Sequence, residues 1–184
     1  NKYIIMRKYS VLTSISLFTV AFLLLNSCKS IPQGVTAVKP FDTNKYLGKW
    51  YEIARLDFKY ERNLNNVTAE YSLKENGKIK VDNKGYNFKK KEWEQSIGKA
   101  KYAGDKDEAK LLVSFFGPFY AGYNVIAIDK EYKYALVAGD SFKNLWLLSR
   151  ETSIPENIKQ GYLQKAREIG YNTEALVWVE HDIK

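Results

Sequence analysis

The feature that most limits the fold is a run of eight short segments between Trp50 and Arg150, in which apolar and polar residues alternate and turn residues intervene. A period of two is typical of strands, and regular turns between strands are typical of a sandwich or a barrel. The predicted strands cover residues 49–57, 66–74, 79–88, 93–103, 110–116, 122–129, 134–139 and 145–150. The chain is therefore predicted to be all-β.

The connections between these segments are short, so consecutive strands are expected to be antiparallel neighbours. Asn76-Gly77, between the second and third segments, is typical of a type I′ hairpin turn. Eight such strands either leave two exposed edges or close on themselves, and closure at this number leaves room for one small ligand. We therefore predict an eight-stranded up-and-down antiparallel barrel rather than a sandwich.

One helix and one short strand are predicted after the barrel. Ser153 and Glu156 have the spacing of a capping box with Pro155 in the first turn, and Gly170 follows the last helical residue. The apolar stripe of this helix is formed by Ile158, Tyr162, Ala166 and Ile169. Residues 175–179 then predict a final strand on the outside of the barrel.

The first 28 residues have the three parts of a secretory signal. Met6-Arg7-Lys8 is followed by a largely apolar stretch from Val11 to Leu25 and by a small residue before Cys28. Four Ser and Thr residues interrupt this stretch, whereas a spanning helix needs about 20 mostly apolar residues. We predict a cleaved signal peptide at 1–27, a lipidated N-terminus and flexible tether at 28–40, and one domain at 41–184.

The segment Leu25-Asn26-Ser27-Cys28 resembles the bacterial lipobox, although Asn26 is a less usual residue at its position. The resemblance implies cleavage before Cys28 and acylation of its thiol. Cys28 is the only cysteine of the chain, so it has no partner for an intrachain disulfide. Lys29 is not the aspartate that retains such lipoproteins at the inner membrane of enterobacteria, which points to a lipid-anchored protein of the outer membrane, facing the periplasm or the surface.

The formal charge of +8 raises the question of a nucleic-acid partner. Loss of residues 1–27 removes three basic residues and no acidic one, which leaves +5, and the remaining basic residues are scattered among acids. The densest run, Lys89-Lys90-Lys91, is followed at once by Glu92 and is interpreted as a solvated turn. We expect no nucleic-acid partner.

Two motifs carry a resemblance to the lipocalin family. Gly48-Lys49-Trp50-Tyr51-Glu52 matches its Gly-x-Trp signature, and Leu147-Leu148-Ser149-Arg150 matches its arginine signature. The resemblance covers about residues 41–180 and is strongest to the bacterial lipocalins and the apolipoprotein D group. The phrases that carry it are Lys49–Arg55, Ser114–Tyr120 and Tyr123–Ala127, whereas the turn Asp129–Tyr132 departs from the Thr-Asp-Tyr form common in other lipocalins.

The direction of the strands predicts at which end of the barrel these signature residues lie. If the first strand runs from the closed to the open end, Trp50, Arg150 and the turn at Asp129 all lie at the closed end. An Arg guanidinium over the indole would close the barrel floor, with a cation–π contribution of about 1 kcal/mol. Gly48, Trp50, Asp129 and Arg150 are therefore predicted to be structural rather than ligand contacts.

Strand parity predicts which side chains face the interior. On four strands the inward set is Val67, Ala69, Tyr71 and Leu73, then Ile79, Val81, Asn83 and Asn87, then Leu111, Val113 and Phe115, and finally Trp146 and Leu148. The resemblance implies that several of these line a pocket. The predicted ligand-binding residues are Tyr71, Asn83, Asn87, Phe115, Trp146, Ala69 and Val113. The alternative is that they fill the barrel as core.

Two further features bear on binding. Glu52 shares parity with Trp50, which puts a carboxylate near the floor, where it would repel an anionic head group and leave it near the mouth. The connection from Phe116 to Gly122 at the open end is conspicuously aromatic. A contiguous exposed apolar patch marks a partner, a membrane or a ligand gate. Two interpretations of this loop stay open: membrane contact or homodimerisation, and simple packing of its rings into the barrel mouth.

The function expected from these features is binding, with storage or transport, of a lipid-like ligand, either a fatty acid or a lysophospholipid. Catalysis is not expected, because His181 is the sole histidine and Cys28 is used by the anchor, so no catalytic residue, metal site or cofactor is predicted. Two alternatives stay open. One is a lipid-modifying enzyme of this fold, and the other is a structural or adhesive surface lipoprotein with a filled barrel.

Overall fold

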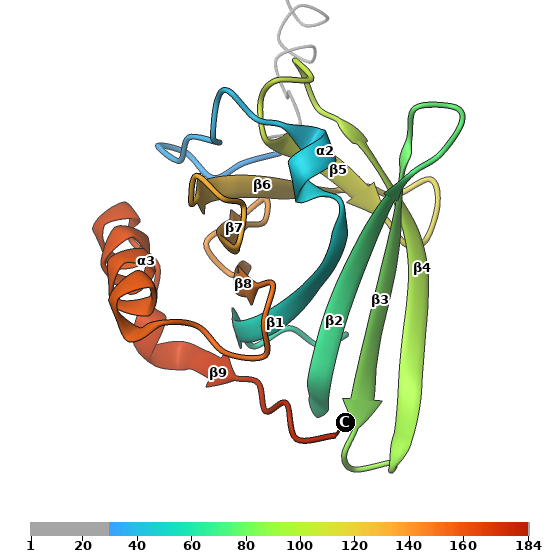
Figure 1. Cartoon of the computed structure of the whole chain (residues 1–184), viewed down its shortest axis with the longest axis vertical. Coiled ribbons are helices and arrows are strands. Elements are labelled where there is room, and N and C mark those ends of the chain that lie inside the picture. The colour runs from blue at the N-terminus through green and yellow to red at the C-terminus, as the bar shows by residue number, and fades with distance from the viewer. Residues whose placement is uncertain (1–29, 184) are drawn as a thin grey trace, which may run out of the picture.

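The computed structural model describes residues 30–183, so the predicted signal peptide and Cys28 lie outside the described residues. Within that range the chain forms one nine-stranded antiparallel sheet (Figure 1). The strands are β1 Gly48–Leu56, β2 Leu64–Leu73, β3 Ile79–Asn87, β4 Glu92–Tyr102, β5 Lys110–Ser114, β6 Ala121–Ile128, β7 Tyr134–Ala138, β8 Leu145–Ser149 and β9 Leu176–Trp178. The first eight coincide with the predicted strands to within two residues at each end.

The sheet closes on itself because β1 pairs with strands on both sides. Its first half pairs with β2, as in Trp50 opposite Ala69, and its second half pairs with β8, as in Glu52 opposite Leu148. Consecutive strands from β2 to β8 are antiparallel neighbours, and β9 adds to the outer end of β1. The predicted up-and-down barrel with a short final strand is confirmed.

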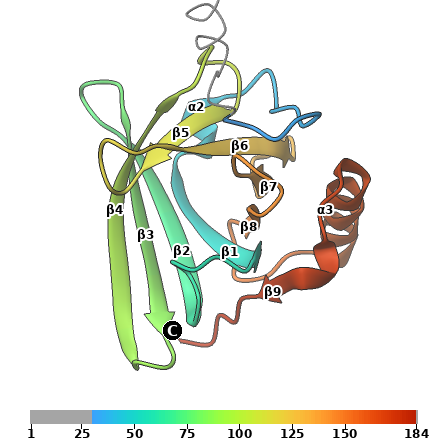
Figure 2. The same ribbon diagram turned by 180° about the vertical axis from the view of Figure 1, so that it is seen from behind.

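Helix α3, Glu156–Ile169, lies on the outside of the barrel, as the front and back views show (Figures 1 and 2). Ala166 of this helix is fully buried against the barrel, and the hydroxyl of Tyr162, also on the helix, donates to the Tyr134 carbonyl at 3.0 Å. Gly170 ends the helix with a left-handed φ of +105°, as predicted. No helix among residues 30–183 has both the length and the hydropathy needed to cross a membrane.

Two predicted local motifs are wrong. The capping box does not form, because Pro155 takes the N-cap position and the Ser153 carbonyl instead accepts a hydrogen bond from Ser149 Oγ. The β2–β3 turn is not type I′, because only Gly77 has a positive φ there. Its amide donates to the Lys74 carbonyl, which is the pattern of a three-residue loop that ends on a left-handed glycine.

The up-and-down order gives the barrel two different ends. The closed end carries helix α2, Thr43–Tyr46, and the connections 74–78, 103–109 and 129–133. The open end carries the connections 57–63, 88–91, 115–120 and 139–144.

Residues 30–40, part of the predicted tether, lie against the barrel. Val35 and Ala37 are buried, and the Val38 amide donates to the Val125 carbonyl at 2.8 Å. Asn124 Nδ2 on β6 donates to the Ser30 carbonyl at 2.7 Å. The part of the tether that the structure describes is therefore held along β6.

Candidate functional site

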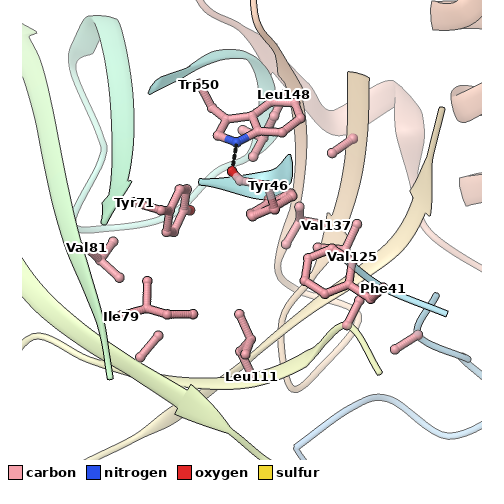
Figure 3. Packing of buried hydrophobic residues seen from close by; sticks show 14 residues of the cluster. Phe41, Tyr46, Trp50, Tyr71, Ile79, Val81, Leu111, Val125, Val137 and Leu148 are labelled. Atoms are coloured by element: carbon pink, nitrogen blue, oxygen red, sulfur yellow. Dashed lines mark hydrogen bonds between the residues drawn. The ribbon is translucent and has the colours of Figure 1, made fainter. Parts of the chain in front are cut away.

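Trp50 forms the centre of the barrel floor. Its indole is 0% exposed, and Nε1 donates to the Tyr46 carbonyl of α2 at 2.8 Å (Figure 3). The Tyr46 ring lies 4.9 Å from the indole and the Phe41 ring 5.3 Å from the Tyr46 ring, measured between centroids. The segment before β1 thus folds across the closed end and covers it with aromatic rings.

Arg150, just after β8, locks this segment in place. Its guanidinium donates to three carbonyls of this segment, to one carbonyl of β1 and to one in the β6–β7 turn, so each of its three nitrogens has at least one acceptor. Those acceptors are Lys45, Tyr46, Leu47, Lys49 and Tyr132. The guanidinium is thus engaged with backbone carbonyls through all three of its nitrogens, as expected of a structural residue.

The other two signature residues, Asp129 and Gly48, also have roles in the backbone structure. Asp129 Oδ1 accepts from the amides of Lys133 and Tyr134, both at 2.7 Å, which holds the β6–β7 turn. Gly48 has a φ of +91°, a region that other residues avoid, and a Cβ there would lie 3.5 Å from Arg150 Nη1. These contacts are those expected of structural residues.

Above the floor the interior is apolar. Buried side chains from all eight barrel strands, from the segment before β1 and from the connection 103–109 form one cluster, which Figure 3 shows. Its members include Phe41, Tyr46, Trp50, Tyr71, Ile79, Val81, Leu111, Val125, Val137 and Leu148. The inward parity predicted for Tyr71, Ile79, Val81, Leu111 and Leu148 agrees with this cluster.

Three tyrosines supply the polar groups of the lower interior. The Tyr123 hydroxyl lies 2.7 Å from that of Tyr71 and 2.6 Å from that of Tyr46. Burial raises the pKa of all three hydroxyls, so they stay neutral and satisfy one another. Tyr71, a predicted ligand contact, is buried and uses its hydroxyl in this chain.

Five inward side chains keep partial exposure although they pack against the interior cluster. They are Ala69, Val113, Phe115, Tyr123 and Trp146. The Phe115 ring lies against Gly98 on β4, where a Cβ would come within 2.8 Å of it. The Trp146 indole lies between Tyr123 and Phe58, at centroid distances of 6.5 and 6.1 Å. Aromatic faces therefore line the upper interior without being fully covered.

The predicted asparagines differ in their surroundings. Asn83 lies beside Ala69 across the β2–β3 pair, and its Oδ1 is buried with no hydrogen-bond partner among residues 30–183. Asn87 instead caps the β3–β4 turn, because Oδ1 accepts from the amides of Lys89 and Lys90 and Nδ2 donates to Glu94. Its polar atoms are thus engaged within the turn, which differs from the predicted ligand contact.

Leu73 was expected to face the interior. It is 54% exposed, because β2 extends beyond the floor before the β2–β3 turn.

A buried charge cluster in the wall was not predicted. Arg55 Nη1 donates to Glu52 Oε1 at 2.7 Å, with both side chains almost fully buried. Arg55 Nη2 donates to the carbonyls of Glu61 and Leu64. The Glu61 carboxylate accepts from Trp146 Nε1 at 2.9 Å, so the cluster adjoins the indole of the upper interior.

The formal charge of this cluster is unbalanced, because one guanidinium, that of Arg55, stands against two carboxylates, those of Glu52 and Glu61. Burial and the nearby charge of Glu61 raise the pKa of Glu52 to about 8, despite the opposing effect of Arg55. Burial also raises the pKa of Glu61. Glu52 is therefore largely protonated at neutral pH, and the expected repulsion of an anionic head group by this residue is correspondingly reduced.

Strand parity missed Arg55 because of a β-bulge. The register with β8 shifts between Glu52 and Ala54, so Arg55 lies opposite Trp146 and shares its face. Strict alternation from Trp50 instead places Arg55 outside the barrel. Glu61 was missed because it lies in the 57–63 loop, where parity has no meaning.

The described residues offer little for metal or histidine chemistry. Within residues 30–183 no three His, Cys, Asp or Glu side chains come together as a metal site would require. His181 Nε2 lies 2.8 Å from the Glu52 carbonyl oxygen, and its ring packs edge-on against Tyr51. The arrangement as a whole is an apolar barrel interior with a polar cluster in one wall.

Comparison with known proteins agrees with this geometry. The model of the lipocalin-like domain family matches residues 41–181. The chain is 49% identical to the outer membrane lipoprotein Blc of Citrobacter freundii, over 92% of this chain and 97% of that one. It is 50% identical to Blc of Escherichia coli, over 88% and 92%.

A similar fold is found in solved structures at much lower identity. Insecticyanin from the tobacco hornworm, Manduca sexta, superposes with a TM-score of 0.67 at 20% identity, over 83% of this chain and 87% of that one. The family model, the identity to the two Blc proteins and the closed barrel agree. The chain belongs to the lipocalin family.

Proposed function

We propose that this lipocalin is a lipid-anchored protein of the outer membrane that binds a single-chain lipid, a fatty acid or a lysophospholipid, inside its barrel. The names of the Blc relatives support the location, and the lipobox at Leu25–Cys28 supplies the anchor. Storage or transport of the lipid follows from reversible binding.

The observation that carries the proposal is the partial exposure of aromatic side chains inside the barrel. Phe115, Tyr123 and Trp146 pack against the interior cluster yet are not fully covered. Below them the floor is closed by Trp50 and Arg150. An acyl chain lying against these rings would bury the remaining apolar surface, at about 25 cal/mol for each Å² removed from water.

Polar groups in the wall bear on the head group. Asn83 Oδ1 is a buried acceptor without a partner among the described residues, and a buried polar group gains stability when it is hydrogen-bonded. A lysophospholipid carries a free hydroxyl that can donate to it, whereas an ionised fatty acid has no such donor. We therefore expect a lysophospholipid to bind more tightly than a fatty acid of equal chain length.

The test is titration of the protein with lysophosphatidylethanolamine and, separately, with palmitate, monitored by tryptophan fluorescence. The parent is compared with Trp146→Phe and with the matched control Trp93→Phe. Trp93 is 45% exposed on β4, where it packs against Tyr86. Most of the ligand-induced change should disappear in Trp146→Phe and persist in Trp93→Phe.

Equal fluorescence changes in both variants would move the ligand away from Trp146. Native mass spectrometry of protein purified from membranes checks the same point without a probe, since a carrier should retain lipid. Protein that is consistently free of lipid and that gives no response in the titration would favour a filled, structural barrel.

A further inference from the structure

Exposed aromatic side chains in the loops of this barrel gather at one end. Tyr60, Phe88, Phe116, Phe119 and Phe142 are 41–78% exposed, and each belongs to one of the four connections 57–63, 88–91, 115–120 and 139–144. All four connections lie at the open end. Among residues 30–183, no aromatic side chain of the closed-end connections 74–78, 103–109 and 129–133 reaches this exposure.

Two of these loops form a continuous aromatic surface. The Tyr60 ring lies 6.2 Å from Phe116 and 5.2 Å from Phe58, between centroids, so the 57–63 and 115–120 loops touch. Phe116 and Phe119 are 66% and 78% exposed. Packing into the barrel mouth, one of the two interpretations of the 115–120 loop, is thus excluded for the rings of Phe116 and Phe119. Phe115, in contrast, packs inside the barrel.

The open end is also the more basic of the two. Its four connections carry six basic residues and three acidic ones, a formal charge of +3. The basic residues are Lys59, Arg62, Lys89, Lys90, Lys91 and Lys143, and the acidic residues are Asp57, Glu61 and Asp140. The closed-end connections carry five basic and six acidic residues, a formal charge of −1. Lys99 and Lys101 add positive charge near the 115–120 loop, since both lie over the Tyr120 ring.

The start of the described chain lies near this same end. Ser30 lies against Gly122, two residues after the 115–120 loop, so closely that a Cβ at Gly122 would clash with the Ser30 carbonyl oxygen. The Asn124 amide that holds Ser30 also donates to the carbonyl of Gly139, the first residue of another open-end loop. Cys28 is two residues before Ser30 in the sequence.

We propose that the open end of the barrel is a membrane-docking surface that fits a bilayer containing anionic phospholipid. Aromatic rings enter the interfacial region of a bilayer, and lysines beside them are attracted to anionic head groups. A second copy of the chain fits less well, because a two-fold interface through these loops would bring two +3 surfaces together.

Docking in this orientation directs the barrel mouth toward the lipid surface. A lipid ligand would then pass between bilayer and barrel without crossing open water. The proposal relies on the anchor of the proposed function but requires no ligand in the barrel, so it is tested separately from lipid binding.

The test uses the acylated protein reconstituted in vesicles of phosphatidylethanolamine and phosphatidylglycerol. Acylation consumes the thiol of Cys28, so a cysteine introduced elsewhere is the sole free thiol. Ala121→Cys places it beside the 115–120 loop with every aromatic ring retained, and Lys106→Cys is the matched control in an exposed closed-end loop. Each is labelled with a fluorophore, and quenching by aqueous iodide is measured.

The label at position 121 should be quenched several-fold less than the label at position 106. Adding Phe116→Ser and Phe119→Ser to the Ala121→Cys protein should remove that protection while acylation and the circular dichroism spectrum stay unchanged. Equal quenching at both positions, or protection at position 106, overturns the proposal. Protection that disappears when the protein is diluted into excess lipid also overturns it, because it assigns the surface to a second copy.

Discussion

The guanidinium carbon of Arg150 lies 3.8 Å from the ring centroid of Trp50, so the residue after the last barrel strand covers a side chain of the first. The contact combines a cation–π interaction of about 1 kcal/mol with hydrogen bonds from Arg150 to the carbonyls around α2. One side chain thereby joins β8, the start of β1 and the segment that covers the floor.

Arg150→Ala is expected to lower the free energy of unfolding by about 2–4 kcal/mol, because it removes the packing over Trp50 and leaves carbonyls without donors. Trp50→Ala should cost a similar amount through loss of a fully buried ring. Urea denaturation followed by circular dichroism measures both, with the exposed Lys143→Ala as the control. An unchanged transition midpoint in either floor variant contradicts the assignment.

Glu52 should make the stability of the barrel depend on pH. Its pKa in the folded protein is about 8 against an ordinary 4.5, so the folded state holds this proton more tightly than the unfolded state does. The free energy of unfolding should therefore fall as pH rises from about 4.5 to about 8. Glu52→Gln carries no such proton, and its stability should decline less over the same range in denaturant titrations.

Glu61→Gln provides the matched test of the cause. Removal of the second carboxylate leaves Arg55 to compensate Glu52 alone, which should lower the pKa of Glu52 and also flatten the decline. A Glu52→Gln protein with the full slope of the parent would show that other groups set the pH dependence.

The fold was predictable because its signal is repeated. Eight alternating segments with short connections are compatible with few strand topologies, and boundary errors of one or two residues do not change which strands pair. The helix was equally clear, since its stripe and Gly170 agree. The predictions of a capping box at Ser153 and of a type I′ turn at Asn76-Gly77 failed because each rests on only two or three residues. Contacts with neighbouring residues override the local preference of so short a motif.

The interior was predictable only where the strands are regular. Parity placed Ala69, Val113, Phe115 and Trp146 correctly against the interior cluster. It failed for Arg55, because the bulge after Glu52 reverses the faces, and a single sequence gives no sign of a bulge at Ile53. The role of Asn87 depends on turn geometry rather than on the face it shares.

Cys28→Ala should abolish acylation, because the thiol is the predicted site of lipid attachment, and should move the protein from the membrane to the soluble fraction. Metabolic labelling with palmitate, followed by fractionation, measures both effects. Continued labelling of the variant contradicts the lipobox assignment. Ser27→Asp, which places a charge just before the cysteine, should reduce processing even though the thiol is retained.

Ala69→Trp should separate a ligand-filled interior from a packed core. Ala69 lies opposite Trp50 on one side and Asn83 on the other, and it is only partly covered. If the space above it holds an acyl chain, the new indole should occupy that space, leave the fold intact and weaken lysophospholipid affinity at least several-fold. If side chains already fill the space, overpacking should instead destabilise the barrel by about 1–3 kcal/mol.

Glu70→Trp is the matched control, since it adds the same ring at the next residue on the outer, exposed face of β2. It should change neither the melting temperature nor the affinity measured by calorimetry. A folded Ala69→Trp protein that binds lysophospholipid as tightly as Glu70→Trp does would place the lipid outside the barrel. The rings of Tyr60, Phe116 and Phe119 at the open end would then be the next site to test, because they are the three most exposed aromatic side chains among residues 30–183.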